Sequence, residues 1–151
     1  MDTINLLLYI EPKPLKRARH SKQGSFIRTY YDKETLQEMD NLKYAIINAL
    51  SEQDRQIILT HEANAHNGLK IALKLEFGFV IPSSYSMKRQ RALKNQPHTN
   101  HIDLDNLIKN VLDRGNGILW NDDKYIHTLT ASKRWSDVNF ISIQIQYEST
   151  Q

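Results

Sequence analysis

Carboxylates that could hold a cation are concentrated between His101 and Trp135. Five of the seventeen acidic residues of this 151-residue chain lie there: Asp103, Asp105, Asp113, Asp122 and Asp123. If the backbone at Asp103 and Asp105 is extended, both side chains leave the same face, with their α-carbons roughly 6 to 7 Å apart. That spacing suits two ligands of one shared cation.

A cluster of carboxylates needs a group that offsets the repulsion between the negative charges. Two carboxylates about 5 Å apart repel by roughly 3 kcal/mol at an effective dielectric constant of 20, so they need a cation, solvent or shared protons. Hard oxygen ligands in a chain without cysteine favour Mg²⁺ or Mn²⁺. A structural alternative stays open. Asp103 or Asp105 could be a helix N-cap that stabilises the fold by about 1 kcal/mol, and the pair at 122–123 could belong to an ordinary turn.

A helix that positions these groups is predicted from Asp105 onward. Apolar residues fall in one arc of its helical wheel, at Leu104, Leu107, Ile108, Val111 and Leu112. Asp105, Lys109 and Asp113 rise one turn apart on the opposite side. The Gly-Asn-Gly run at 115–117 should end the helix, because these residues tolerate left-handed backbone. The helix is therefore expected to bury one side and to present two carboxylates and a lysine on the other.

The run DLDNLIKNVLD followed by NDDKYI resembles the RusA-type Holliday junction resolvases. That family has an Asp-x-Asp-Asn-Leu-x-Lys helix, then a loop, then an Asp-Asp pair that opens a strand. One departure is visible, because Ile102 stands where the family usually has proline before the first aspartate. The substitution concerns local rigidity and leaves the candidate ligands in place.

The resemblance implies a specific set of functional residues. Asp103, Asp105 and Asp123 correspond to catalytic metal ligands, Asp122 is a neighbour in the metal site, and Lys109 corresponds to a required lysine. The implied cofactor is Mg²⁺, with Mn²⁺ able to substitute.

The implied reaction is hydrolysis of phosphodiester bonds at branched DNA, chiefly four-way junctions. A homodimer is expected, because a junction has approximate two-fold symmetry and needs two matched cuts. Two alternatives stay open: a DNA-binding protein whose acidic cluster is structural or inactive, and a nuclease for flaps or other branched DNA. The chain has no glycine-rich phosphate loop, which argues against a nucleotide cofactor.

Basic residues gather in two segments, although the net charge is only +3. The first contains Lys13, Lys16, Arg17 and Arg19, and the second contains Lys88, Arg89, Arg91 and Lys94, near Tyr85. Lys133 stands where RusA-type sequences often have a lysine. We expect these side chains to contact DNA phosphates. The alternative for each is an ordinary solvated surface residue.

The rest of the chain predicts an α+β fold with a mixed, mostly antiparallel sheet of four or five strands and two main helices on one face. The predicted strands are 4–10, 26–31, 69–79, 125–134 and 138–147, with a hairpin turn at 135–137. Asp32 is the predicted N-cap of a helix that runs to about Glu52. Residues 53–68 show no periodicity, and residues 80–102 are predicted to be a long, flexible basic loop.

Four histidines and one glutamate are weaker candidates. His61 and His66 are predicted to be exposed to solvent rather than bound to metal. His98 and His101 could join the metal, but hard oxygen sites rarely use imidazole. Glu76 is either a fourth carboxylate ligand or an exposed residue on the polar face of strand 69–79, and its position favours the exposed residue.

Length and composition set the general expectations. At this length we expect a single RusA-like domain over residues 1–151. The longest N-terminal apolar run, residues 6–10, is too short for a signal peptide or a membrane span. Without cysteine, disulfides and thiolate metal sites are not possible. We therefore expect a cytoplasmic protein with no membrane partner.

Overall fold

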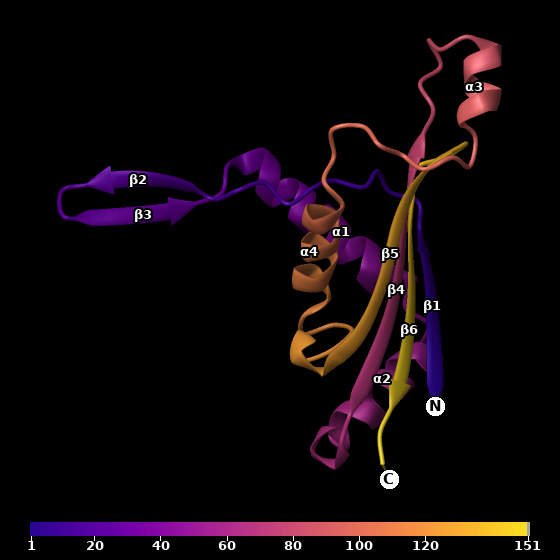
Figure 1. Cartoon of the computed structure of the whole chain (residues 1–151). Helices are drawn as coiled ribbons and strands as arrows, with labels where there is room; N and C mark the ends of the chain where they lie inside the picture. The colour runs from indigo at the N-terminus through magenta and orange to yellow at the C-terminus, as the bar shows by residue number, and fades with distance from the viewer. Residues whose placement is uncertain (151) are drawn as a thin grey trace.

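The computed structural model describes residues 1–150 and shows one mixed sheet at its centre. The sheet has the order β1-β6-β4-β5 (Figure 1), with strands β1 (Asp2–Leu8), β6 (Phe140–Glu148), β4 (Lys70–Val80) and β5 (Ile126–Ser136). β5 runs parallel to β4, whereas β6 is antiparallel to both β1 and β4. The predicted α+β class with a mixed sheet is confirmed.

The core lies against one face of this sheet. Along β4, Leu73, Leu75 and Phe77 are buried, whereas Lys74 on the opposite face is exposed. This alternation is the two-residue period of a strand that is covered on one face. The strand predicted at 69–79 is therefore confirmed almost residue for residue.

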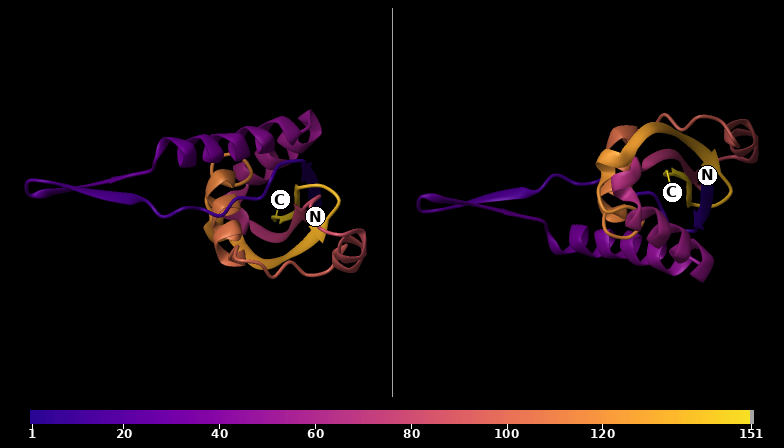
Figure 2. Two further views of the ribbon diagram at one scale, coloured as in Figure 1. Left: turned by 90° about the horizontal axis from the view of Figure 1, so that it is seen from above. Right: turned by 90° about the horizontal axis from the view of Figure 1, so that it is seen from below.

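Two long helices cover the core face. Helix α1 (Lys33–Ala49) packs against β1, and helix α4 (Leu104–Gly115) packs against β5. The two helices also contact each other, and α4 lies between α1 and β5 (Figure 2). Asp32 caps α1 as predicted, since its Oδ1 accepts a hydrogen bond from the Thr35 amide at 2.7 Å. Hydrogen bonds from Thr35, from its side chain first and its amide second, hold the pKa of Asp32 below its ordinary value.

A further helix, α2 (Glu52–Ala63), follows α1 where the sequence predicted irregular chain. The prediction was wrong because α2 buries few apolar residues and so has little hydrophobic periodicity. Its local signal is a capping box, in which Ser51 and Asp54 exchange hydrogen bonds at 3.0 Å. A short 3₁₀ turn, η1 (Ala65–Asn67), leads from α2 to β4.

His61 on α2 is buried, which corrects its predicted exposure, whereas His66 is exposed as predicted. The His61 ring lies between Asp2 and Ser149, with nitrogen to oxygen distances of 2.6 and 2.8 Å. It therefore joins the two ends of the described chain.

A separate two-stranded sheet projects from the body (Figures 1 and 2). It consists of β2 (Arg19–Gln23) and β3 (Phe26–Tyr30), joined at Gly24, whose φ of +63° is in the left-handed region. β3 was predicted, but β2 was predicted as part of a basic loop. All residues of β3 are exposed, so this hairpin contributes no core face that a periodic pattern would reveal.

Residues 80–102 are more ordered than predicted. They contain helix α3 (Met87–Leu93), capped by Ser86. Residues 95–98 then pair with the end of β5, where the Asn95 and His98 amides donate to the carbonyls of Trp135 and Lys133, each at 3.1 Å. The prediction of a long irregular loop was wrong, because a helix of two turns is too short to show a clear hydrophobic period.

The predicted hairpin between the last two strands was also wrong. β5 and β6 are not neighbours, because both pair with β4, which lies between them. The connection crosses the end of β4, where the Val80 amide donates to Asn139 Oδ1 at 2.9 Å. Among residues 1–150, no helix has the length and apolar character needed to cross a membrane.

Candidate active site

Helix α4 presents the predicted polar stripe. Leu107 and Val111 are each 1% exposed and anchor the helix to the core. Asp105 and Lys109 are exposed one turn apart, and Asp113 is half-buried one turn further on. Within residues 1–150, Lys109 forms no ion pair with either aspartate. Its ammonium group is therefore available to an outside anion.

Asp103 and Asp105 stand at the start of α4, but not on one extended segment. Asp103 is the N-cap residue, with extended backbone, and Asp105 lies in the first helical turn. The Asp103 side chain makes no capping hydrogen bond within the described chain. Capping therefore does not occupy its carboxylate, and both Asp103 and Asp105 are exposed.

Lys133 holds the segment that leads into Asp103. Its ammonium group donates hydrogen bonds to the carbonyls of Ile102 and of Asn100, the latter at 3.3 Å. The side chain is half-buried. Lys133 was predicted to face DNA; its observed contacts position the first carboxylate of the site.

Asp122 and Asp123 lie at the opposite end of α4, in the loop before β5 (Figure 1). A helix of twelve residues is about 18 Å long at 1.5 Å per residue. Asp122 Oδ1 accepts a hydrogen bond from the Lys124 amide at 2.9 Å, which is the role of a turn residue. Asp123 begins the short 3₁₀ helix η2 (Asp123–Tyr125) and is exposed.

One chain thus separates the predicted ligands into two pairs. Among residues 1–150, no three His, Asp or Glu side chains lie close enough together to hold a metal ion. Aspartate oxygens suit Mg²⁺, but the pair at the start of α4 and the pair at its end cannot share one ion within a single chain.

The loop after α4 is fixed by packing. Trp120 is 1% exposed, and its Nε1 donates to Asn116 Oδ1 at 2.9 Å. A β-carbon on Gly115 would lie 2.6 Å from Trp120 Cζ2, so only glycine fits beneath this ring. The Asn121 amide donates to Glu62 Oε1 on α2 at 2.9 Å. These contacts set the position of the second aspartate pair.

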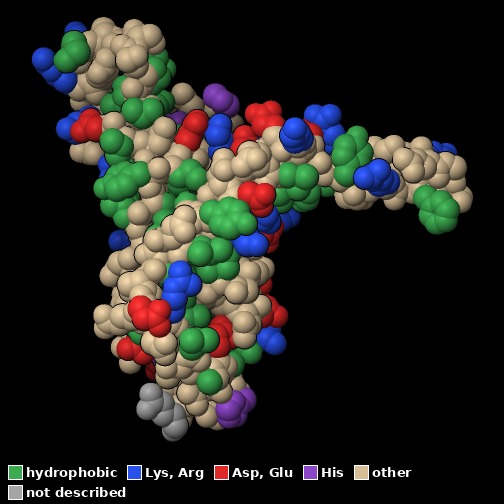
Figure 3. All heavy atoms as spheres, turned by 180° about the vertical axis from the view of Figure 1, so that it is seen from behind, with side chains coloured by type: hydrophobic (Ala, Val, Ile, Leu, Met, Phe, Trp, Pro, Cys, Tyr) green, Lys and Arg blue, Asp and Glu red, His purple; other side chains and the backbone are tan. Residues whose placement is uncertain are grey.

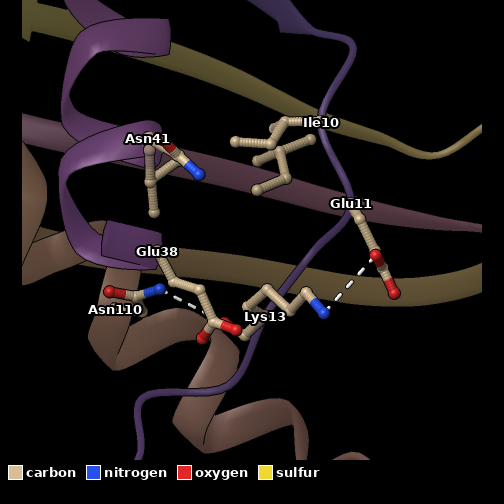
Figure 4. A pocket seen from close by; sticks show the side chains of 8 residues that line it. Ile10, Glu11, Lys13, Glu38, Asn41 and Asn110 are labelled. Atoms are coloured by element: carbon tan, nitrogen blue, oxygen red, sulfur yellow. Dashed lines mark hydrogen bonds and ion pairs between the residues drawn. The ribbon is translucent and has the colours of Figure 1, made fainter. Parts of the chain in front are cut away.

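The first basic segment crosses α4 near its start. Asn110 Nδ2 donates to the Lys13 carbonyl at 3.2 Å (Figure 4), and the Leu15 amide donates to the Asn106 carbonyl at 3.4 Å. Asn106 and Asn110 are one turn apart, and their anchoring role was not predicted from the sequence. Their spacing on α4 was visible in the sequence, but the segment that they bind could not be deduced from it.

Comparison with known families adds a decisive observation. The family model described as endodeoxyribonuclease RusA matches residues 10–146 of the chain. The chain belongs to the RusA endodeoxyribonuclease family. No curated protein matches its sequence.

The RusA match covers both basic segments as well as α4. The hairpin β2–β3 and helix α3 project on either side of the end of the molecule at which α4 begins, and Figure 3 shows Lys and Arg side chains on both projections. On the first segment, Lys16 and Arg17 are exposed; Arg19 pairs with Asp32 at 3.2 Å. Exposed ion pairs of this kind contribute only about 0 to 1 kcal/mol, so the pair is easily exchanged for a phosphate.

The second basic segment lies on and around α3. Lys88, Arg89 and Arg91 are exposed, and the Arg89 guanidinium lies 3.6 Å from the centre of the Tyr85 ring. Lys94 pairs with Asp137 at 3.0 Å. A helix that holds three cations on its surface can contact a DNA backbone.

The histidines and the glutamate that were weaker candidates for the metal site lie away from the aspartates or are exposed to solvent. His98 is 4% exposed and stacks on Phe79, with ring centres 4.1 Å apart. Burial, and then the charge of Lys133, lower the pKa of His98. His101 is exposed two residues before Asp103. Glu76 is half-buried in an ion pair with Arg134, so it is neither the predicted exposed residue nor a neighbour of α4.

Proposed function

We propose that the chain is a magnesium-dependent endonuclease that resolves four-way DNA junctions by paired cleavage, with Mn²⁺ able to replace Mg²⁺. The observation that carries the proposal is the start of α4, where two exposed carboxylates and Lys109 stand in the RusA motif between two basic projections. We assign this activity to one domain that spans residues 1–151 and acts as a homodimer. Two copies would bring two sets of catalytic groups to the two strands of a symmetric junction.

Each group has a proposed role. Asp103, Asp105 and Asp123 would supply oxygen ligands for Mg²⁺, and Asp122 would hold the turn beside Asp123. Lys109 would neutralise the charge that builds on the phosphate in the transition state, an effect worth about 10² to 10³ in rate for comparable groups.

The basic side chains would bind the junction arms. The β2–β3 hairpin, which follows the basic segment held on α4, and helix α3 project in different directions from the end that carries Asp103, so each can follow a different duplex arm. Exposed lysines and arginines bind phosphates by releasing counterions, and this binding does not depend on sequence. Selectivity for branched DNA would come from the shape of the basic surface rather than from base contacts.

The separation of the aspartate pairs within one chain supports one competing function, an inactive DNA-binding protein. A test uses end-labelled DNA as a four-way junction, a linear duplex and a flap, each with Mg²⁺, with Mn²⁺ and with EDTA. Paired cuts in the junction alone, dependent on the metal, support the proposal. Binding without cleavage identifies the competing function, and preferred cleavage of the flap identifies a flap nuclease.

A further inference from the structure

The β2–β3 hairpin carries side chains that the body of the molecule does not cover. All five residues of β3 are exposed, among them Phe26, which is 77% exposed, and Tyr30, which is 38% exposed. Figure 3 shows apolar and basic side chains together on this projection. Aromatic rings stabilise a fold when they are buried, so rings left in solvent contribute little to it. Their gathering on one projection marks a surface for a partner.

The register of the hairpin places its aromatic residues on one face together with arginines. Phe26, Arg28 and Tyr30 alternate along β3 and therefore point to the same side, whereas Ile27 points to the other. Opposed residues in an antiparallel pair share a face, so Arg19, which pairs with Tyr30, joins the first side. We call the side formed by Phe26, Arg28 and Tyr30 the aromatic face.

The spacing along the aromatic face suits flat rings. Alternate residues of a strand are about 6.6 to 6.8 Å apart, and stacked bases lie about 3.4 Å apart. One base therefore fits between two neighbouring side chains and stacks on both. The Arg28 guanidinium lies 5.9 Å from the centre of the Tyr30 ring, whereas that of Arg89 lies only 3.6 Å from the Tyr85 ring. The pair on the hairpin is thus open, and a small rotation of these exposed side chains admits a base.

The charge of the hairpin identifies the partner as nucleic acid. Residues 19–30 include Arg19, Lys22 and Arg28 and contain no acidic residue. Positive side chains interleaved with aromatic rings are complementary to a strand that presents phosphates and bases. Lysine is depleted from interfaces between proteins, so the exposed Lys22 opposite Ile27 argues against a second protein chain as the partner.

We propose that the aromatic face of the hairpin binds unpaired DNA bases by stacking. Phe26 and Tyr30 provide the ring surfaces, Arg28 stacks between them, and the nearby cations hold the phosphates of the same strand. The inference deepens the proposed function and rests on it for the source of the bases, which is the branch point of the junction. Stacking uses the face of a base rather than its edge, so it adds selectivity for branched DNA without reading sequence.

Binding to single-stranded DNA tests the proposal without cleavage. The probe is a labelled oligothymidine strand of about 12 nucleotides, titrated by fluorescence anisotropy in EDTA. Loss of one stacked base should raise the Kd of Phe26→Ala about 5- to 150-fold. Ile27→Ala is the matched control, because Ile27 is the next residue, is 71% exposed and lies on the opposite face, and it should bind as the wild type does. Equal affinity of all three proteins, or an equal loss in both variants, overturns the proposal.

Two further probes separate stacking from attraction to phosphates. An abasic strand of the same length has the same phosphates, and a blunt duplex hides the faces of its bases. Phe26→Ala should bind both of these as the wild type does. Arg28→Lys keeps the charge but lacks the planar guanidinium, so it should weaken binding to oligothymidine alone. If Phe26→Ala loses as much affinity for the abasic strand as for oligothymidine, the face does not bind bases and the proposal fails.

An introduced tryptophan reports stacking directly. The two native tryptophans, Trp120 and Trp135, are only 1% and 7% exposed, so DNA would chiefly reach a tryptophan on the hairpin. Phe26→Trp should retain binding, and oligothymidine should quench the added emission. Ile27→Trp is the matched control and should be quenched much less. Equal quenching of the two variants, or quenching by the abasic strand, contradicts stacking on the aromatic face.

A second copy of this chain is the competing partner for the aromatic face. Light scattering of the wild type and of Phe26→Ala at one concentration tests it. A lower mass of the variant, with unchanged binding to oligothymidine, assigns the face to contact between copies and overturns the proposal.

The binding measurements also separate this inference from the proposed function, because none of them depends on cleavage. If the wild type cuts no junction but Phe26→Ala alone loses binding to oligothymidine, the proposed function fails and the stacking face stands. If the wild type cuts junctions while Phe26→Ala binds oligothymidine normally, the proposed function stands and the stacking face fails.

Discussion

The two ends of helix α4 differ in how they are held. At its start, Asp103 and Asp105 are exposed, and the chain before them is held by hydrogen bonds from Lys133 to backbone carbonyls. At its end, a buried tryptophan above Gly115 fixes the loop that carries Asp122 and Asp123. The start is thus positioned by polar contacts, and the end by packing. Changes to the exposed aspartates should alter chemistry with little effect on stability, and changes to the packing between Gly115 and Trp120 should alter stability.

The largest effect is expected from the aspartates. Asp103→Asn or Asp123→Asn should lower junction cleavage by at least about 10³-fold, which is about 4 kcal/mol of transition-state stabilisation. Junction binding should be equal or tighter, because less negative charge opposes the phosphate. Single-turnover cleavage and a binding titration measure the two effects. Asp113→Asn, on the same helix, is the control and should cleave normally; near-normal cleavage by the other two variants would remove them from the site.

Loss of Lys109 should come next. Lys109→Ala is expected to reduce turnover by about 10²-fold, as for a group that stabilises charge in the transition state. Its free energy of unfolding should change by less than about 0.5 kcal/mol, because the side chain is exposed. Cleavage rates and urea denaturation measure these quantities. Unchanged turnover would leave Lys109 as an ordinary surface residue.

A change at the packed end of α4 should lower stability and leave cleavage intact. Gly115→Ala forces a methyl group toward Trp120, and overpacking of this kind costs about 1 to 3 kcal/mol of stability. Urea denaturation should show this loss, and cleavage should persist where the variant is folded. Lys109→Ala is the matched control, because it alters the same helix without a core contact. Equal stability of the two variants would contradict the proposed difference between the ends.

The basic helix α3 should affect binding more modestly. Replacing Lys88, Arg89 and Arg91 with alanine should flatten the dependence of junction affinity on salt. Three lost phosphate contacts would reduce the slope of log K against log salt by up to about 2.7. A matched control replaces Lys43, Lys70 and Lys74, which are also exposed, with alanine. This control variant has the same net charge as the α3 variant. If both triple variants lower the slope equally, α3 has no specific part in binding.

The smallest effect concerns His98 and the loss of folding stability at acid pH. Because burial lowers the pKa of His98 below its ordinary value of 6.5, the unfolded chain takes up the proton first. Protonation therefore favours unfolding, and stability should fall as the pH drops below about 6.5 toward the lowered pKa of the folded state. His98→Phe should flatten this dependence, and His66→Phe, at an exposed position, should not. Unfolding midpoints from pH 7.5 to pH 5 provide the measurement.

The sequence by itself determined the features that depend on near neighbours. The apolar arc and polar stripe of α4, the alternation of β4 and the N-cap at Asp32 were all predicted, and all are observed. Each depends on residues two to four positions apart, which is the range over which helices and strands repeat. The spacing of the aspartates and Lys109 was likewise enough to suggest the family that the profile match then showed.

Only the tertiary structure decided which segments meet. The sequence predicted a hairpin of the last two strands, but the long buried β4 separates them, because it pairs with both. The burial of His61 also depends on a partner far along the chain, Asp2. The family resemblance grouped Asp123 with Asp103 as ligands, and the structure adds that α4 holds the two residues at opposite ends of one chain. A helix holds the residues at its two ends a fixed distance apart. Its packing against the sheet determines the orientation of the helix, and so where in the fold each end lies.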